Sequence, residues 1–192
     1  MDVDVERQVE ASPTAMTAVR RFRVPPALAA IAVTAIYGTV NVGVPIALST
    51  LGLKRGWEGT RPGLANLVGL APLVGGLVVV ILAASDHAKA WRRLDWRFMK
   101  VDPEHLLTPD YLVTDGLYRL SRNPLYVGDI AMWTGWAILL GSLQVAAGLV
   151  ALIVGLQVGV RMEERGLARQ FGAEWDAYER ATPRFLGRPG RR

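Results

Sequence analysis

The sequence predicts an all-α membrane protein with about four transmembrane helices and with both termini in the cytoplasm. Hydrophobic residues make up 51% of the 192 residues and gather in long runs with at most one charge. A helix needs about 20 apolar residues to cross a bilayer. Four runs are expected to span, at residues 27–51, 63–85, 124–142 and 144–160. A soluble helical core could contain one such apolar run by chance, but the presence of four favours a membrane protein.

The placement of the basic residues predicts the orientation. The chain holds 22 Lys and Arg residues. Three of them lie between the first two runs and none lies between the last two. The other 19 lie before residue 27, in the middle segment 86–123, or in the tail 161–192. Basic residues are enriched in cytoplasmic loops, so these three segments are expected to face the cytoplasm. The net charge of +5 therefore indicates topology and headgroup contact, not a nucleic-acid partner.

The cysteine count and the N-terminal stretch narrow the class of protein further. No cysteine is present, which excludes disulfides. Residues 1–22 begin with an acidic, polar stretch, without the basic start and early apolar core of a secretory signal. We expect a disordered or interfacial lead there, followed by one membrane domain over residues 23–192. Without a targeting signal, direct insertion into a bacterial cytoplasmic membrane is expected.

The third run begins at a motif rich in polar groups, Ser121-Arg122-Asn123-Pro124. Asn is a favoured N-cap and Pro is favoured at the first helical position. The free N–H groups at a helix N-terminus favour an anion. Arg119 and Arg122 add positive charge beside it, so a carboxylate or phosphate could bind here. The alternative is that both arginines contact only lipid headgroups.

Two further groups of charges flank this motif. Asp129 lies inside the third run, where a carboxylate is costly unless it faces protein or water. It is expected to bind a cationic group, to pair with an arginine, or to be protonated. Arg161, Glu163 and Glu164 follow the fourth run. The short turn at residues 141–142 makes the last two runs antiparallel, so these charges should lie at the depth of the Asn-Pro motif. A plain interfacial ion-pair cluster is the alternative.

The tail also carries an apolar stripe. Leu167, Phe171, Trp175 and Tyr178 recur at helical spacing. Gly172 is expected to break or bend this helix. The stripe predicts an amphipathic helix that lies on the membrane or packs against the domain.

Two stretches resemble a known family. LVTDGLYRLSRNPLYVG, at residues 112–128, and EERGLARQFGAEWDAYERATPRFL, at residues 163–186, are similar to motifs of the integral-membrane methyltransferases. That group includes isoprenylcysteine carboxyl methyltransferases and phospholipid methyltransferases. Both stretches stand in the family's order around a helical hairpin. The resemblance implies transfer of a methyl group from S-adenosylmethionine to a membrane-borne lipid or prenyl-type acceptor, leaving S-adenosylhomocysteine.

The resemblance also implies which residues form the site, built from the middle segment and the tail. The cofactor-binding residues would be Tyr111, Leu112, Val113, Tyr118, Asn123, Pro124, Tyr126 and Glu163. The residue chemistry adds Arg122, whose positive charge at the helix start suits the methionyl carboxylate. By their charge and position, Arg161, Glu164 and Asp129 are the expected contacts to the acceptor. No metal is expected.

Two positions depart from the family pattern. Asn123 stands where the family has His, and an amide cannot titrate as an imidazole does. Gly159 stands where some members place an acceptor-binding Arg, and Arg161 is the nearest candidate. These departures leave the acceptor open: carboxylate, amine, thiol or hydroxyl.

Two alternatives remain at this stage. Membrane sterol reductases have a similar tail and bind NADPH, whose 2′-phosphate would suit the arginines. A non-catalytic lipid-binding protein of the same fold is the other, and the change at Asn123 is compatible with it.

Overall fold

The computed structural model describes residues 26–93 and 111–187. The predicted lead at residues 1–22 and part of the middle segment lie outside the described residues. The helices are α1 (Pro26–Gly38), the π-helical turn η1 (Thr39–Gly43), α2 (Val44–Ser49), α3 (Leu64–Leu67), α4 (Leu70–Arg93), the 3-10 helix η2 (Gly116–Arg119), α5 (Pro124–Leu140), α6 (Leu143–Phe171) and α7 (Ala173–Ala181). Two short strands, β1 (Trp57–Glu58) and β2 (Arg61–Pro62), pair as a hairpin.

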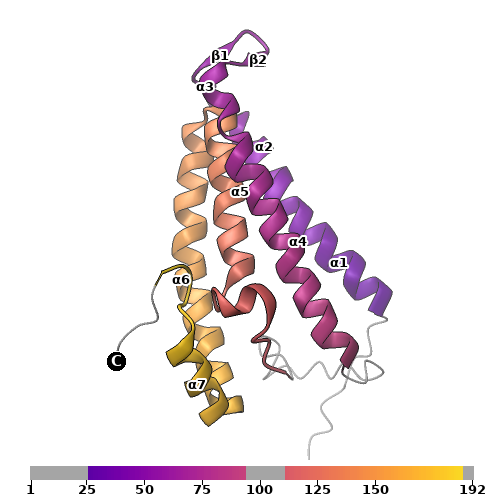
Figure 1. Ribbon diagram of the computed structural model, residues 1–192. Coiled ribbons are helices and arrows are strands. Elements are labelled where there is room, and N and C mark those ends of the chain that lie inside the picture. Colours follow the sequence, from indigo (N-terminus) through magenta and orange to yellow (C-terminus); the bar gives the residue numbers. More distant parts are fainter. Residues whose placement is uncertain (1–25, 94–110, 188–192) are drawn as a thin grey trace, which may run out of the picture.

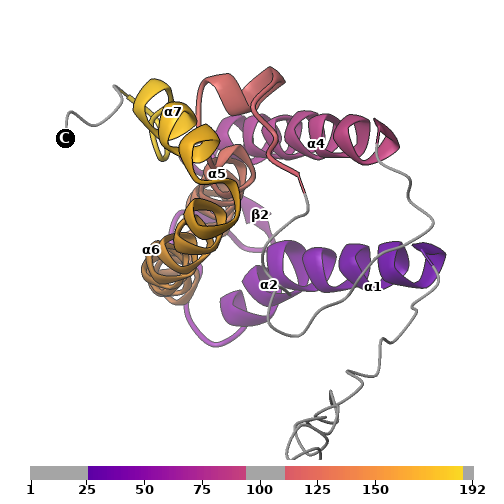
Figure 2. The same cartoon turned by 90° about the horizontal axis from the view of Figure 1, so that it is seen from below.

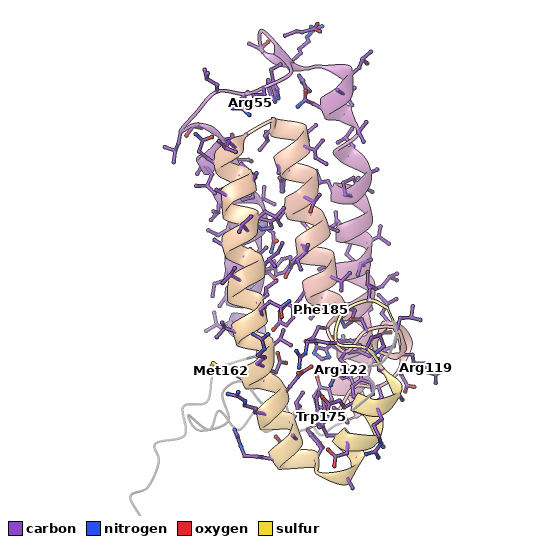
Figure 3. All side chains as sticks on the ribbon, turned by 90° about the vertical axis from the view of Figure 1, so that its left-hand side faces the viewer. Arg55, Arg119, Arg122, Met162, Trp175 and Phe185 are labelled. Atoms are coloured by element: carbon purple, nitrogen blue, oxygen red, sulfur yellow. The ribbon has the colours of Figure 1, made fainter. Side chains whose placement is uncertain are left out.

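The long helices form an elongated bundle (Figure 1). The β1–β2 hairpin lies at one end and α7 lies at the other. Figure 3 shows Arg55 at the hairpin end and Arg122 and Trp175 at the α7 end. The segments gathered at the hairpin end of the bundle therefore differ from those gathered at the α7 end.

Three stretches of the described chain are long and apolar enough to cross a membrane: Ile31–Ser49, Leu64–Lys89 and Leu143–Phe171. They cover three of the four predicted spans. The remaining one, α5, is apolar but has 17 residues. At 1.5 Å per residue it extends about 25 Å, short of the roughly 30 Å hydrocarbon core. It ends at Leu140 because Gly141 takes the left-handed conformation, with φ +56°. The helix after it continues to Phe171, well beyond the predicted boundary at residue 160.

Glycines set the packing of α4 against α5. A Cβ built on Gly76 would lie 2.5 Å from the carbonyl oxygen of Gly128. Two turns further along α5, a Cβ on Gly135 would lie 2.5 Å from the backbone nitrogen of Leu73. Small residues let membrane helices approach this closely. The two backbones are thus in contact, which places the start of α5 against the end of α4.

The hairpin end closes the turn between α5 and α6. Ser142 caps α6, its Oγ accepting a hydrogen bond from the backbone N–H of Val145 at 3.3 Å. The Trp57 indole donates to the carbonyl of Leu139 at 3.0 Å, and the Asn66 amide donates to the carbonyl of Ile138 at 2.7 Å. The tight antiparallel turn expected at residues 141–142 is confirmed.

The chain reverses between α6 and α7. Gly172 has φ +50°, and the expected helix break at this residue is confirmed. Leu167, Trp175 and Tyr178 are buried together, with Phe171 packed beside them. The apolar stripe therefore packs against the domain, which was one of the two expected arrangements.

Candidate functional site

The strip before α5 is fastened to the end of α4. Gly116 has φ +62°, and a Cβ there would lie 2.0 Å from Oδ2 of Asp86. That same oxygen accepts a hydrogen bond from the backbone N–H of Leu117 at 3.0 Å. The Lys89 ammonium holds the other oxygen at 2.8 Å. The backbone conformation favours glycine at residue 116, and a side chain there would also require the Asp86 carboxylate to move.

The loop at the start of α5 is fastened to the tail. The backbone N–H of Arg122 donates to the carbonyl of Pro183 at 2.9 Å. The Asn123 amide donates to the carbonyl of Arg184 at 2.9 Å, and the Ser121 hydroxyl donates to the same oxygen at 3.3 Å. The middle segment and the tail thus meet, as the hairpin geometry predicts.

These bonds correct one expectation about Asn123. It occupies the N-cap position and Pro124 begins α5, as the motif predicts. Its side chain makes no capping hydrogen bond, however. The amide is used on the tail instead, because the carbonyl of Arg184 lies within reach and takes its N–H. Asn123 therefore ties two segments together.

A buried ion-pair group lies behind this loop. The single Nε–H of Arg184 is shared between the two carboxylate oxygens of Glu164, at 2.9 and 3.1 Å. Arg122, with 7% of its side chain exposed, lies 3.4 Å from Glu164 and 3.0 Å from Glu179. Its guanidinium also lies 5.4 Å from the ring centre of Trp175. The hydrogen bond to Glu164 raises the pKa of Arg184, so its guanidinium remains charged. The group thus sets two arginines against two glutamates.

A pocket opens beside this group at the α7 end. It measures about 510 Å³, part of it open to solvent. Its walls come from the end of α4, the strip before α5, the start of α5, the last turns of α6, and α7. The lining residues are His87, Tyr111, Leu112, Val113, Tyr118, Arg122, Asn123, Leu125, Tyr126, Glu163, Leu167, Trp175 and Tyr178.

All the residues predicted to bind a cofactor line this pocket except Pro124, which forms the first turn of α5 between two lining residues. Tyr126 donates a hydrogen bond from its hydroxyl to Oε2 of Glu163 at 3.1 Å. Burial raises the pKa of Tyr111 to about 12, and that of Tyr118 rises for the same reason. These phenols therefore stay neutral and can act as donors at any physiological pH.

Sequence reasoning missed several lining residues, of which His87 is the most notable. Its ring stacks on Tyr118, with centres 5.2 Å apart, and meets the edge of Tyr111 at 6.0 Å. Its Nδ1 is buried and has no hydrogen-bond partner among the described residues. The only sequence feature that could have pointed to His87 as a pocket residue is its place at the end of an apolar run, next to the charged Asp86.

The residues predicted to contact the acceptor do not line the pocket. Arg161 is exposed on α6. Glu164 is engaged by the two arginines, which matches the ion-pair alternative. Asp129 is buried inside the bundle, where the Tyr37 hydroxyl donates to its Oδ1. Arg119, expected beside the anion site, is exposed and pairs with Asp115 at 3.0 Å.

Metal ligands are not grouped in the described part of the chain. No three His, Cys, Asp or Glu residues there are placed to hold an ion.

The structure combines apolar helices long enough to cross a membrane with a pocket between a helix start and a folded-back tail. The sequence model of the phospholipid methyltransferase family matches residues 64–174, more than half of the chain. The protein belongs to this family and is a membrane methyltransferase. The matched range runs from α3 to the start of α7 and contains most of the pocket lining. Comparisons with curated proteins and with solved structures found no match.

Proposed function

We propose that the protein transfers the methyl group of S-adenosylmethionine to a membrane-borne lipid or prenyl-type acceptor. The pocket carries this proposal. Residues of the methyltransferase-like motif and Glu163 of the tail line one cavity, although they lie some 40 residues apart along the chain.

The chemistry of the pocket fits S-adenosylmethionine. The cofactor presents an adenine ring, ribose hydroxyls, a sulfonium and the amino and carboxylate groups of methionine. The aromatic rings of His87, Tyr111, Tyr118 and Tyr126 suit the adenine and the sulfonium cation. Glu163 suits the hydroxyls or the amino group. Nδ1 of His87 and Nε of Arg122 are buried without a hydrogen-bond partner among the described residues, and a bound polar molecule can supply one.

Each residue then has a distinct task. When bound, S-adenosylmethionine supplies an electrophilic methyl group. Tyr126 orients the Glu163 carboxylate through its hydroxyl, so that the carboxylate can receive donors from the ligand. Glu164 and Arg184 hold the tail against the start of α5, and we assign Glu164 this positioning task in place of direct acceptor contact. Methyl transfer needs alignment and exclusion of water more than covalent help, and the folded-back tail forms one wall of the pocket that can contribute to both.

The orientation follows from the charges. We place the α7 end, both termini and the pocket on the cytoplasmic side of a bacterial membrane, with α5 as a short fourth span. The asymmetry of the basic residues supports this. Exposed Arg161 then lies at the headgroup layer, where it suits an anionic lipid phosphate.

A reductase has less support. A 2′-phosphate would need free arginines in the pocket. Arg122 and Arg184 are paired with glutamates, and Arg119 pairs outside with Asp115. The non-catalytic alternative would keep cofactor binding and lack turnover.

Isothermal titration of the detergent-purified protein with S-adenosylhomocysteine tests the proposal, with NADPH as the comparison ligand. We expect micromolar binding of S-adenosylhomocysteine, lost in Glu163→Ala and in Tyr126→Ala. Binding of NADPH without S-adenosylhomocysteine would overturn the proposal. Cofactor binding without methyl transfer to any lipid in extracted bacterial membranes would favour the non-catalytic alternative.

A further inference from the structure

A groove lies at the hairpin end of the bundle, away from the pocket at the α7 end. It measures about 760 Å³, part of it open to the surroundings. The turns at residues 55–56 and 141–142 contribute to its lining. Its apolar lining residues are Ala65, Ala137, Ile138, Leu143 and Ala146. The groove shares no lining residue with the pocket.

The order of the helices explains the groove. In the view along the bundle, α5 lies between α4 and α6 (Figure 2). Because α3 leads into α4, the groove runs from α3 across the last turn of α5 to the first turn of α6. Alanines at residues 65, 137 and 146 leave the space between these segments open.

Arg55 gives this groove a positive charge at a fixed place. Its backbone N–H donates to the carbonyl of Gly141 at 2.9 Å, and its own carbonyl accepts a hydrogen bond from the Asn66 amide at 3.1 Å. The residue is exposed, and none of the ion pairs between described residues includes it. Among the described residues, no Asp or Glu lines the groove. The guanidinium is therefore left without a counter-charge.

The loop around Arg55 is basic as a whole. Lys54, Arg55 and Arg61 stand there against one acid, Glu58. These are the three basic residues outside the segments expected to face the cytoplasm, and such residues are less common on the other side of a membrane. The Lys54 ammonium lies 4.3 Å from the ring centre of Trp57. This loop therefore presents a net positive charge to an approaching headgroup.

Large apolar side chains are exposed beside this charge. Leu53 and Leu64 have 88% and 86% of their surface exposed, and Leu143, which lines the groove, has 61%. Exposed apolar surface of this kind marks a membrane or binding surface. An apolar track that ends at an arginine suits an amphipathic anion.

We propose that this groove binds an anionic phospholipid in the leaflet opposite to the pocket, with the phosphate on Arg55 and an acyl chain along the apolar lining. A guanidinium binds phosphate through two parallel hydrogen bonds. The 17-residue α5 is shorter than the hydrocarbon core, and a short span thins the bilayer beside it, which brings headgroups toward the turn at residues 141–142. A second copy of the chain, placed side by side, would set two basic loops against each other.

Binding of three probes to the full detergent-purified chain tests the inference. They are dioctanoyl phosphatidylglycerol, dioctanoyl phosphatidylcholine and glycerol 3-phosphate: an anionic lipid, a zwitterionic lipid with the same tails, and an anionic headgroup fragment without tails. Each is titrated calorimetrically in the absence of cofactor. We expect the phosphatidylglycerol to bind at least about tenfold more tightly than either of the others.

Three variants locate the site. Arg55→Gln should weaken binding of the phosphatidylglycerol about tenfold, to the level of the phosphatidylcholine. Arg165→Gln is the matched control, because it makes the same change at an exposed residue near the other end of α6, and it should alter nothing. Ala146→Leu adds volume within the groove and should weaken binding of both lipids.

Several outcomes would overturn the inference. Equal binding of the two lipids by the unaltered protein would remove the selection for an anion. Glycerol 3-phosphate binding as tightly as the phosphatidylglycerol would make this a site for a soluble anion. A preference that survives Arg55→Gln, or that falls equally in Arg165→Gln, would place the recognition elsewhere.

The remaining outcomes concern the fold and the tails. Equal loss of both lipids in Arg55→Gln with a lowered melting temperature would make Arg55 a residue that only holds the turn. Unaltered lipid binding in Ala146→Leu would place the tails outside the groove. The inference does not depend on the proposed function: S-adenosylhomocysteine should bind Arg55→Gln as it binds the unaltered protein, and its failure to bind either would overturn that function alone.

Discussion

The hydroxyl of Tyr126 on α5 donates a hydrogen bond to the carboxylate of Glu163 on α6, at 3.1 Å. This bond joins two antiparallel helices at the wall of the pocket. Glu163 lies outside the Arg184–Glu164 ion pair, and within the described ranges its carboxylate is oriented by this one neutral donor. Its position is therefore sensitive to the loss of one oxygen atom.

Tyr126→Phe should weaken binding of S-adenosylhomocysteine about tenfold. The ring and its packing remain, and only a hydrogen bond to a charged group is lost, worth about 1.5 kcal/mol. Isothermal titration measures the change. Arg165→Gln, an exposed change two residues after Glu163, is the control and should leave the affinity unaltered. Unaltered binding in Tyr126→Phe would show that the bond does not position Glu163.

Arg184→Gln should destabilise the tail. It removes the paired hydrogen bonds to Glu164 and leaves that buried carboxylate with Arg122 alone. We expect a loss of about 2 kcal/mol and a melting temperature lower by several degrees, with weaker cofactor binding. Arg180→Gln, also an arginine to glutamine change but at an exposed residue of α7, should leave both unchanged. Equal melting of the two variants would contradict this account of the ion pair.

Gly76→Ala should disrupt the contact between α4 and α5. The added methyl would lie 2.5 Å from the carbonyl oxygen of Gly128, so the helices must separate. We expect a cost of about 1–3 kcal/mol, read as a lower melting temperature in detergent. Gly75→Ala is the neighbouring control, because nothing lies within 4 Å of its added Cβ. If both variants melt alike, close backbone contact is not what holds these helices.

Gly116→Ala should weaken ligand binding in the pocket in addition to the stability that an alanine loses in a left-handed conformation. The residue has φ +62°, and its Cβ would collide with Asp86. Gly59 has nearly the same φ, +64°, with open space around its Cβ. Both variants should lose about 1 kcal/mol from the left-handed backbone, but only Gly116→Ala should lose binding of S-adenosylhomocysteine. Retained binding in Gly116→Ala would mean that the strip before α5 can shift without affecting the site.

Much of the site was predictable because its residues stand in one short motif. The motif at residues 112–128 and the acid at residue 163 predicted most of the pocket lining. His87 and Trp175 were not predicted, because their roles depend on how α4 and α7 fold against that motif. The same is true of Tyr37, which reaches Asp129 of α5 from α1.

The sequence by itself determined that the chain is helical, apolar enough for a membrane, and related to membrane methyltransferases. These properties follow from hydrophobic runs, helix punctuation and local motifs, which act over short distances along the chain. Only the tertiary structure decided which charges are available. It paired Arg122 and Arg184 with Glu164, sent Arg119 and Arg161 to the surface, and buried Asp129 against Tyr37. A charge is neutralised or left free by its neighbours in space, and the partners of Glu164 and Asp129 lie at least 20 residues away from them in the chain.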